Sequence, residues 1–163
     1  MNMDFLKLFT NPVLLAPGCA WIIAQVLKAI INAIMNKKFS WDRLFGDGGM
    51  PSGHSAIVTA LATMTGLVKG FGSVEFAIAF IFALVVMRDA MGVRREAGKQ
   101  AASIIKISEL LNDYFSEHDQ RIKTDKLKVL VGHTPLQVVC GALLGMAISI
   151  GYFLIYNNIV NVV

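Results

Sequence analysis

Apolar residues gather into four long blocks along the chain, and these blocks predict membrane helices. They cover about residues 12–35, 52–69, 74–93 and 134–156. A helix needs roughly 20 mostly apolar residues to cross the hydrocarbon core of a bilayer. The first and last blocks reach this length. The middle pair are short, so a partly re-entrant pair is an alternative for them.

A polar segment, residues 94–132, separates the third block from the fourth. Apolar residues recur in it at near-helical spacing, which predicts an amphipathic helix along the membrane surface or over the functional site. They are Ile104, Ile105, Ile107, Leu110, Leu111, Tyr114 and Phe115. Residues 120–128 read as a polar connector, after which another short helical turn is expected.

Composition places the chain among membrane proteins. It is 55% hydrophobic and only 16% charged, against about 25% charged residues in ordinary soluble domains. Its length of 163 residues fits one domain. We therefore expect a single membrane-embedded, all-α domain over residues 1–163. It is predicted to be a helical bundle with about four transmembrane helices and one amphipathic interfacial helix.

The net charge of +4 would suit a nucleic-acid partner, but beside lipid-crossing segments a basic excess more often reports membrane topology. With four spans, the loops after the first and third spans lie on one side of the membrane. They carry eleven of the fifteen basic residues, whereas the other side carries Lys7 and Lys69. The positive-inside rule therefore predicts that these loops face the cytoplasm and both termini face outward. No nucleic-acid partner is expected.

Two histidines lie where predicted helices begin on this basic side. His54 falls in the first turn of the second span, with Ser52 as its N-cap. His133 directly precedes the fourth span, where Pro135 fits the first turn. Helix N-termini attract phosphate through free N–H groups and the positive end of the helix dipole. Gly53 would let the backbone approach such an anion closely.

Arg94 and Arg95 follow directly where the third span emerges on the same side. Arginine makes fork-like contacts with phosphate oxygens. Taken singly, a histidine at the interface is an ordinary polar residue, and an arginine pair is a topology signal. Their convergence on one side, beside two helix starts, instead indicates a phosphate-handling site.

The residues around these groups resemble a known family. Pro51-Ser52-Gly53-His54 is similar to the central motif of the phosphatidic acid phosphatase type 2 superfamily, which includes lipid phosphatases and vanadium haloperoxidases. The fuller pattern resembles the small, divergent membrane branch of that superfamily. The matching stretches are residues 48–56 (GGMPSGHSA), residues 89–95 (DAMGVRR) with Gly98 and Gln100, and residues 132–135 (GHTP).

The resemblance implies a two-step phosphate transfer that needs no metal and no cofactor. His133 would attack phosphorus and form a phosphohistidine, which water then hydrolyses. His54 would protonate the leaving alcohol. The phosphoryl oxygens would be held by Arg94, Arg95, Lys28, Ser52 and Gly53, with Asp89 and Gln100 in support.

Lys28 and Gln137 are both unusual residues for their positions. Lys28 lies inside the first span, where a charge is costly unless it snorkels or finds a partner, and we expect it to reach phosphate or to pair with Asp89. Gln137 stands four residues after His133, where the family has an acid. Its amide oxygen can accept a hydrogen bond from the imidazole. It cannot stabilise a positively charged ring as a carboxylate does. The superfamily's first basic motif is also absent upstream of Pro51.

These residues predict a lipid-phosphate phosphomonoesterase at the cytoplasmic face of the bacterial plasma membrane. Phosphatidylglycerophosphate, phosphatidic acid and polyprenyl phosphates are the candidate substrates, with the first favoured by topology. The alternative, raised by Gln137, is a catalytically weak or inactive protein that binds lipid phosphate. A small transporter subunit has less support, because the polar groups lie at one face. Gly141 and Gly145 form a small-xxx-small pair, which predicts packing within the bundle or, alternatively, a homodimer.

Overall fold

A computed structural model describes residues 7–37, 49–114 and 132–160 of the chain, and within these ranges it contains helices and no strand. The elements are η1 (Lys7–Thr10), α2 (Pro12–Asn36), α4 (Gly53–Lys69), α5 (Val74–Met91), α6 (Val93–Tyr114) and α7 (Pro135–Val160). The all-α prediction is confirmed, and each predicted span matches a helix to within a few residues. The sequence pattern missed η1. The connector predicted at residues 120–128 lies outside the described residues.

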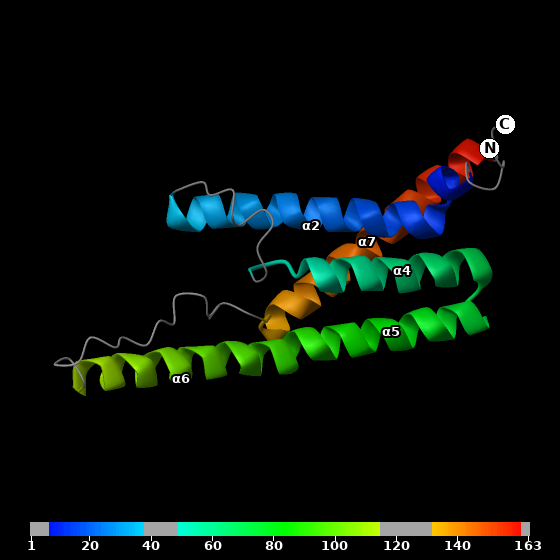
Figure 1. Ribbon diagram of the computed structural model, residues 1–163. Coiled ribbons are helices and arrows are strands. Elements are labelled where there is room, and N and C mark those ends of the chain that lie inside the picture. The colour runs from blue at the N-terminus through cyan, green and yellow to red at the C-terminus, as the bar shows by residue number, and fades with distance from the viewer. Residues whose placement is uncertain (1–6, 38–48, 115–131, 161–163) are drawn as a thin grey trace.

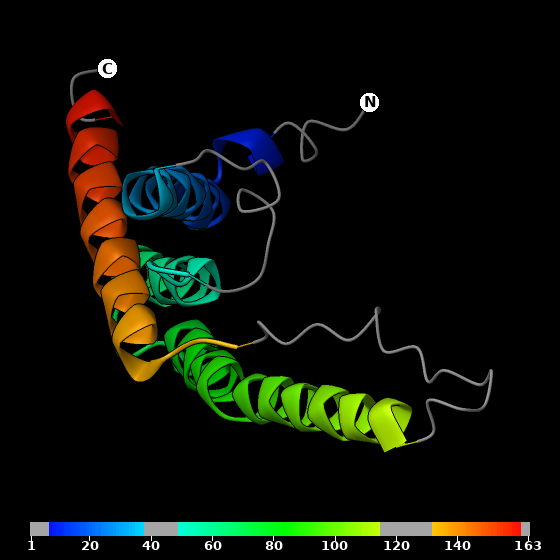
Figure 2. The ribbon, with the colours of Figure 1, turned by 90° about the vertical axis from the view of Figure 1, so that its left-hand side faces the viewer.

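The helices are arranged around α4, which packs against α7, α2 and α5. In Figure 1, α2 and α5 run in one direction while α4 and α7 run in the other. Figure 2 shows α2, α4 and α5 stacked in a layer, with α7 lying across one side of it. The N-termini of α4 and α7 are therefore at the same end of the bundle, as the four-span topology predicts.

Three stretches are long and apolar enough to cross a membrane: Pro12–Met35, Val74–Asn112 and Pro135–Asn158. The helix α4 is shorter, at 17 residues. Its hairpin with α5 nevertheless extends to the end of the bundle where α2 begins, because Lys69 and Glu75 line one cavity together with Asn11. The hairpin thus runs the length of the bundle, as a crossing pair does.

Small residues form the contact between α4 and α7. A Cβ added to Gly141 would overlap the carbonyl oxygen of Ser52, and one added to Gly145 would overlap that of Ala56. The Ser149 hydroxyl donates a hydrogen bond to the Ala60 carbonyl at 2.9 Å. The glycine row therefore serves packing within one chain. A homodimer through the same row stays a prediction.

Residue size is distributed as membrane packing requires. The buried hydrophobic positions are mostly alanine, for example Ala20, Ala24 and Ala60, whereas large side chains such as Ile78 and Ile81 are exposed. In lipid there is no hydrophobic force to bring helices together, so small residues that allow close backbone approach gather at the contacts. The outward apolar side chains then face hydrocarbon.

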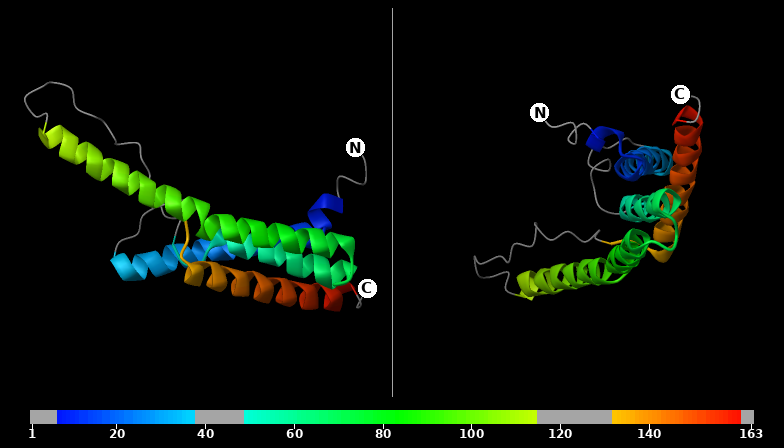
Figure 3. Two further views of the ribbon diagram at one scale, coloured as in Figure 1. Left: turned by 90° about the horizontal axis from the view of Figure 1, so that it is seen from below. Right: turned by 90° about the vertical axis from the view of Figure 1, so that its right-hand side faces the viewer.

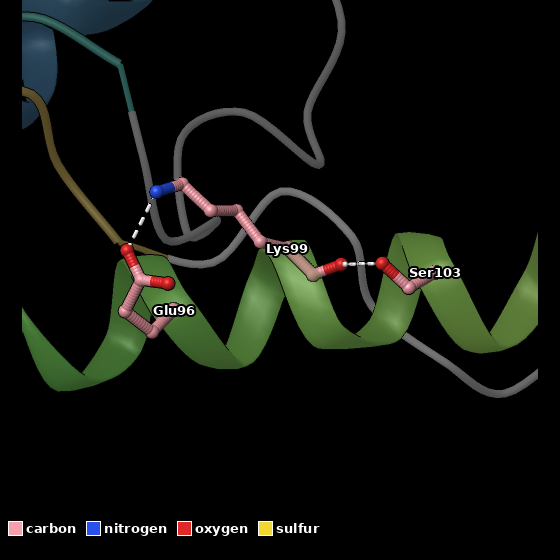
Figure 4. Close-up of polar contacts among 3 residues, drawn as sticks. All are labelled: Glu96, Lys99 and Ser103. Atoms are coloured by element: carbon pink, nitrogen blue, oxygen red, sulfur yellow. Dashed lines mark hydrogen bonds and ion pairs between the residues drawn. The ribbon is translucent and has the colours of Figure 1, made fainter.

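The helix α6 continues from α5 after Gly92, whose N–H donates to the Arg88 carbonyl at 2.9 Å. Figures 1 and 3 show α6 projecting beyond the other helices. On its exposed side, Lys99 pairs with Glu96 at 2.6 Å, and the Ser103 hydroxyl donates to the Lys99 carbonyl (Figure 4). Such an exposed ion pair contributes at most about 1 kcal/mol. The predicted helix is present, and its position on a membrane surface stays a prediction.

Candidate functional site

The last residues before α4 are fixed against α7. Gly49 has a φ of +88°, a conformation that favours glycine. Ser52 is the N-cap of α4, as predicted: its fully buried hydroxyl oxygen accepts the N–H of Ser55 at 3.3 Å. The Ser52 N–H in turn donates to the carbonyl oxygen of Gln137 at 3.0 Å. The first turn of α4 is thereby fixed against the first turn of α7.

The segment that carries His133 is anchored to α5. Gly132 has a φ of +96°, and the backbone N–H of His133 donates to the Ala90 carbonyl at 2.9 Å. The His133 side chain is only 3% exposed. The end of α5 and the start of α7 are thus joined at His133, for which the family resemblance implies the role of nucleophile.

Gln137 has a structural use that the sequence analysis missed. Its side-chain oxygen accepts the N–H of Thr134 at 3.0 Å, and the Thr134 hydroxyl oxygen accepts the N–H of Gln137 at 3.4 Å. This reciprocal pair is a capping box, whose signature Thr-x-x-Gln is present at residues 134–137. The same Gln137 oxygen lies 3.3 Å from Nδ1 of His133. One amide therefore both closes the start of α7 and orients the histidine ring.

The two imidazoles lie side by side. The ring centroids of His54 and His133 are 6.1 Å apart, with an interplanar angle of 60°. They come from the starts of different helices, which are separated by about half of the chain. Topology predicted only that the two histidines lie on the same side of the membrane. The structure places their rings next to each other.

Lys28 belongs to the same end of the bundle. Its side chain is 5% exposed, and its Cγ would lie 3.3 Å from a Cβ placed on Gly49. Lys28 and Gln137 line one cavity of about 310 Å³. Asn32, one turn further along α2, lines it too and was not predicted. Asn32 could have been predicted from the sequence, because it is polar and follows Lys28 by four positions inside an apolar block. Residues at this spacing share one face of a helix.

The remaining predicted residues divide into two groups. Asp89 lines a separate cavity together with His54, so it is near the histidines. Arg95 and Gln100 are exposed on α6 and line neither of these cavities. The side chain of Arg94 lies outside the described residues. Phosphate binding by these α6 residues, and the pairing of Lys28 with Asp89, stay predictions.

Two residues of α2 approach the start of α4 and were not predicted. A Cβ placed on Gly53 would lie 3.5 Å from the Trp21 ring and 3.6 Å from Nε2 of Gln25. The side-chain oxygen of Gln25 is buried and has no hydrogen-bond partner among the described residues. Within the described ranges, no group of three or more His, Cys, Asp or Glu side chains could hold a metal ion.

Comparisons with known proteins found a matching family and a similar protein. A family model described as the Divergent PAP2 family matches residues 9–148. The chain is also similar to an uncharacterized membrane protein, YuiD, of Bacillus subtilis (strain 168). The two are 42% identical over 151 residues, which cover 89% of this chain and 96% of that protein. No solved structure matches the chain.

Proposed function

The chain belongs to the divergent PAP2 family, and we propose that it hydrolyses phosphate monoesters of membrane lipids. The observation that carries this proposal is the pair of adjacent imidazoles, His54 and His133, at the starts of α4 and α7. Both helix starts favour bound phosphate. Lys28 adds a cation at the same end of the bundle.

In the proposed first step, His133 attacks the phosphorus of the lipid phosphate. Its Nδ1 faces the Gln137 oxygen, an acceptor, and so carries the proton of the neutral ring. Nε2 then holds the lone pair that forms the N–P bond. The P–O bond to the lipid alcohol breaks as His54 gives that alcohol its proton.

In the second step, water attacks the phosphohistidine and transfers a proton to His54. The N–P bond breaks, which releases inorganic phosphate and restores both rings. Charge on the phosphoryl oxygens is offset by Lys28 and by the N–H groups at the start of α4. Arg94 and Arg95 are proposed to add to this binding from the beginning of α6.

The proposed substrates are phosphatidylglycerophosphate, phosphatidic acid and polyprenyl phosphates, met at the cytoplasmic face of the bacterial plasma membrane. The support for this orientation is the excess of lysine and arginine in the loops at the site end of the bundle.

The test is a phosphate-release assay on the purified chain with these lipids in mixed micelles. We expect release by the wild type, none by His133→Ala, and about 10²–10⁴-fold less by His54→Ala. An acid-labile, alkali-stable phosphoprotein should form in the wild type and be absent in His133→Ala. Equal release by all three proteins would contradict the proposed roles.

Gln137 favours a second candidate function, a membrane protein that binds lipid phosphate without turnover. An amide in place of the family's acid weakens the histidine as a nucleophile. The same assay separates the two functions. Binding of lipid phosphate without release, in the wild type and in Gln137→Glu alike, would support the binding protein.

A further inference from the structure

An apolar groove leads away from His54. It has a volume of about 770 Å³ and runs between α2, α4 and α5, lined by apolar side chains such as Leu14, Val58 and Val85. His54 and Asp89 are the polar side chains in its wall. Both lie toward the site end of the bundle, in the first turn of α4 and near the end of α5.

This groove continues along the bundle. A second cavity, of about 490 Å³, shares Val13, Leu61 and Phe82 with the first and extends to Lys69 and Glu75. From His54 to Lys69, α4 rises by about 22 Å at roughly 1.5 Å per residue. Half of a bilayer core is only about 15 Å thick. The combined groove therefore runs past the middle of the membrane.

The groove lies on the side of α4 that α7 leaves open. Ser52, Ala56 and Thr59 of α4 meet the glycines of α7, whereas Ile57, Val58 and Leu61 line the groove. Figure 2 shows α7 on one side of the layer formed by α2, α4 and α5. Of the remaining described helices, α6 packs only against α5 and η1 only against α2. In a bilayer this open side faces hydrocarbon.

We propose that this groove binds the hydrocarbon chain of the substrate in extended form, with the phosphate at His54 and His133. The proposal rests on the proposed phosphatase function and narrows its substrate. A single chain longer than one leaflet fills the groove from end to end, so a polyprenyl monophosphate fits it better than a two-chain glycerolipid. The charged residues Lys69 and Glu75 mark the far end, at the opposite interface.

Gly18 offers a way to block the groove without disturbing the fold. It lines the groove, and a Cβ added to it would meet nothing within 4 Å. A phenylalanine at this position would therefore occupy the space of the chain. Gly151 of α7 is a matched control, because its Cβ would also meet nothing within 4 Å and it lines neither cavity.

The experiment compares wild type, Gly18→Phe and Gly151→Phe on butyl phosphate, dioleoyl phosphatidate and a long-chain polyprenyl phosphate. The wild type should have its highest kcat/KM on the polyprenyl phosphate. The preference for polyprenyl over butyl phosphate should fall at least about tenfold in Gly18→Phe, since small displacements of a bound substrate can cost up to about 10²-fold. Gly151→Phe should keep the preference.

Binding of the polyprenyl phosphate, measured by native mass spectrometry, separates failure of this inference from failure of the proposed function. Loss of binding in Gly18→Phe alone, with no phosphate released from any lipid, would support the groove and refute the phosphatase. Phosphate release with equal preference in all three proteins, or a preference for the two-chain lipid, would overturn the groove assignment and leave the phosphatase standing.

Discussion

Replacing Gln137 by glutamate is the most informative single change at this site. The Gln137 oxygen accepts the Thr134 N–H at 3.0 Å and lies 3.3 Å from Nδ1 of His133. A glutamate can make both contacts, because Glu and Gln serve equally at this position of a capping box. The exchange therefore alters the charge next to the histidine ring and leaves the start of α7 intact.

The expected increase in kcat of Gln137→Glu follows from the charge of the hydrogen-bond acceptor. A hydrogen bond to a charged group contributes about 1.5–3 kcal/mol, against about 0.5–1.5 kcal/mol for a neutral one. A difference of about 1.4 kcal/mol in the transition state corresponds to about tenfold in rate. Neutralising the acid that orients a catalytic histidine in serine proteases costs about 10⁴-fold, which sets an upper bound. We expect Gln137→Glu to raise kcat at least about tenfold.

The assay is phosphate release from lipid phosphate, with thermal unfolding in detergent as a control for folding. Gln137→Met, which has similar size but no acceptor, should lose activity and about 1 kcal/mol of stability with the capping contact. If Gln137→Glu were as stable as the wild type and no faster, the hydrogen bond to His133 would not limit the reaction. The proposed orientation of the nucleophile would then be wrong.

Three further outcomes are expected. Gly141→Ala should lower the free energy of unfolding by about 1–3 kcal/mol, because its methyl group overlaps the Ser52 backbone. Gly151→Ala should leave the free energy of unfolding unchanged, because the space around Gly151 is open. Equal unfolding temperatures for the two variants would refute the close contact. Lys28→Met should raise KM for lipid phosphate about tenfold or more, whereas Lys28→Arg should retain part of the affinity. An unchanged KM in both variants would exclude Lys28 from phosphate binding. Ser149→Ala removes a hydrogen bond to the Ala60 carbonyl, and thermal unfolding should show a loss of about 0.6 kcal/mol; a loss of several kcal/mol would mean that more than this bond is involved.

Most of the fold could be predicted from the sequence, because membrane helices are recognised by their length and their apolar composition. The predicted blocks match α2, α4, α5 and α7 closely, and the amphipathic spacing matched α6. The short helix η1 could not be found in this way, since four residues carry no periodic pattern. The sequence also did not show which helix faces meet, apart from the glycine row of α7, because α5 and α7 are apolar on all sides.

The site was predictable where a residue type and a helix start coincide, as at Ser52, His54 and His133. The sequence did not predict the roles of residues whose neighbours come from other helices. Gln25 and Asn32 lie on α2 and reach the site only because α2 passes the start of α4. The capping function of Gln137 is an exception, because the local Thr-x-x-Gln signature at residues 134–137 is enough to predict it.

The shortness of α4 has a consequence for the bilayer itself. Its 17 residues rise by about 25 Å, less than the roughly 30 Å of a typical hydrocarbon core. The neighbouring α2 continues past its start, so Lys28 lies beside Gly49 and not at the helix end. Thinning of the bilayer around α4 is one way in which a membrane matches a helix of this length. In the proposed phosphatase, such thinning would bring head groups closer to the histidines, and a lipid would not have to leave its leaflet to be dephosphorylated.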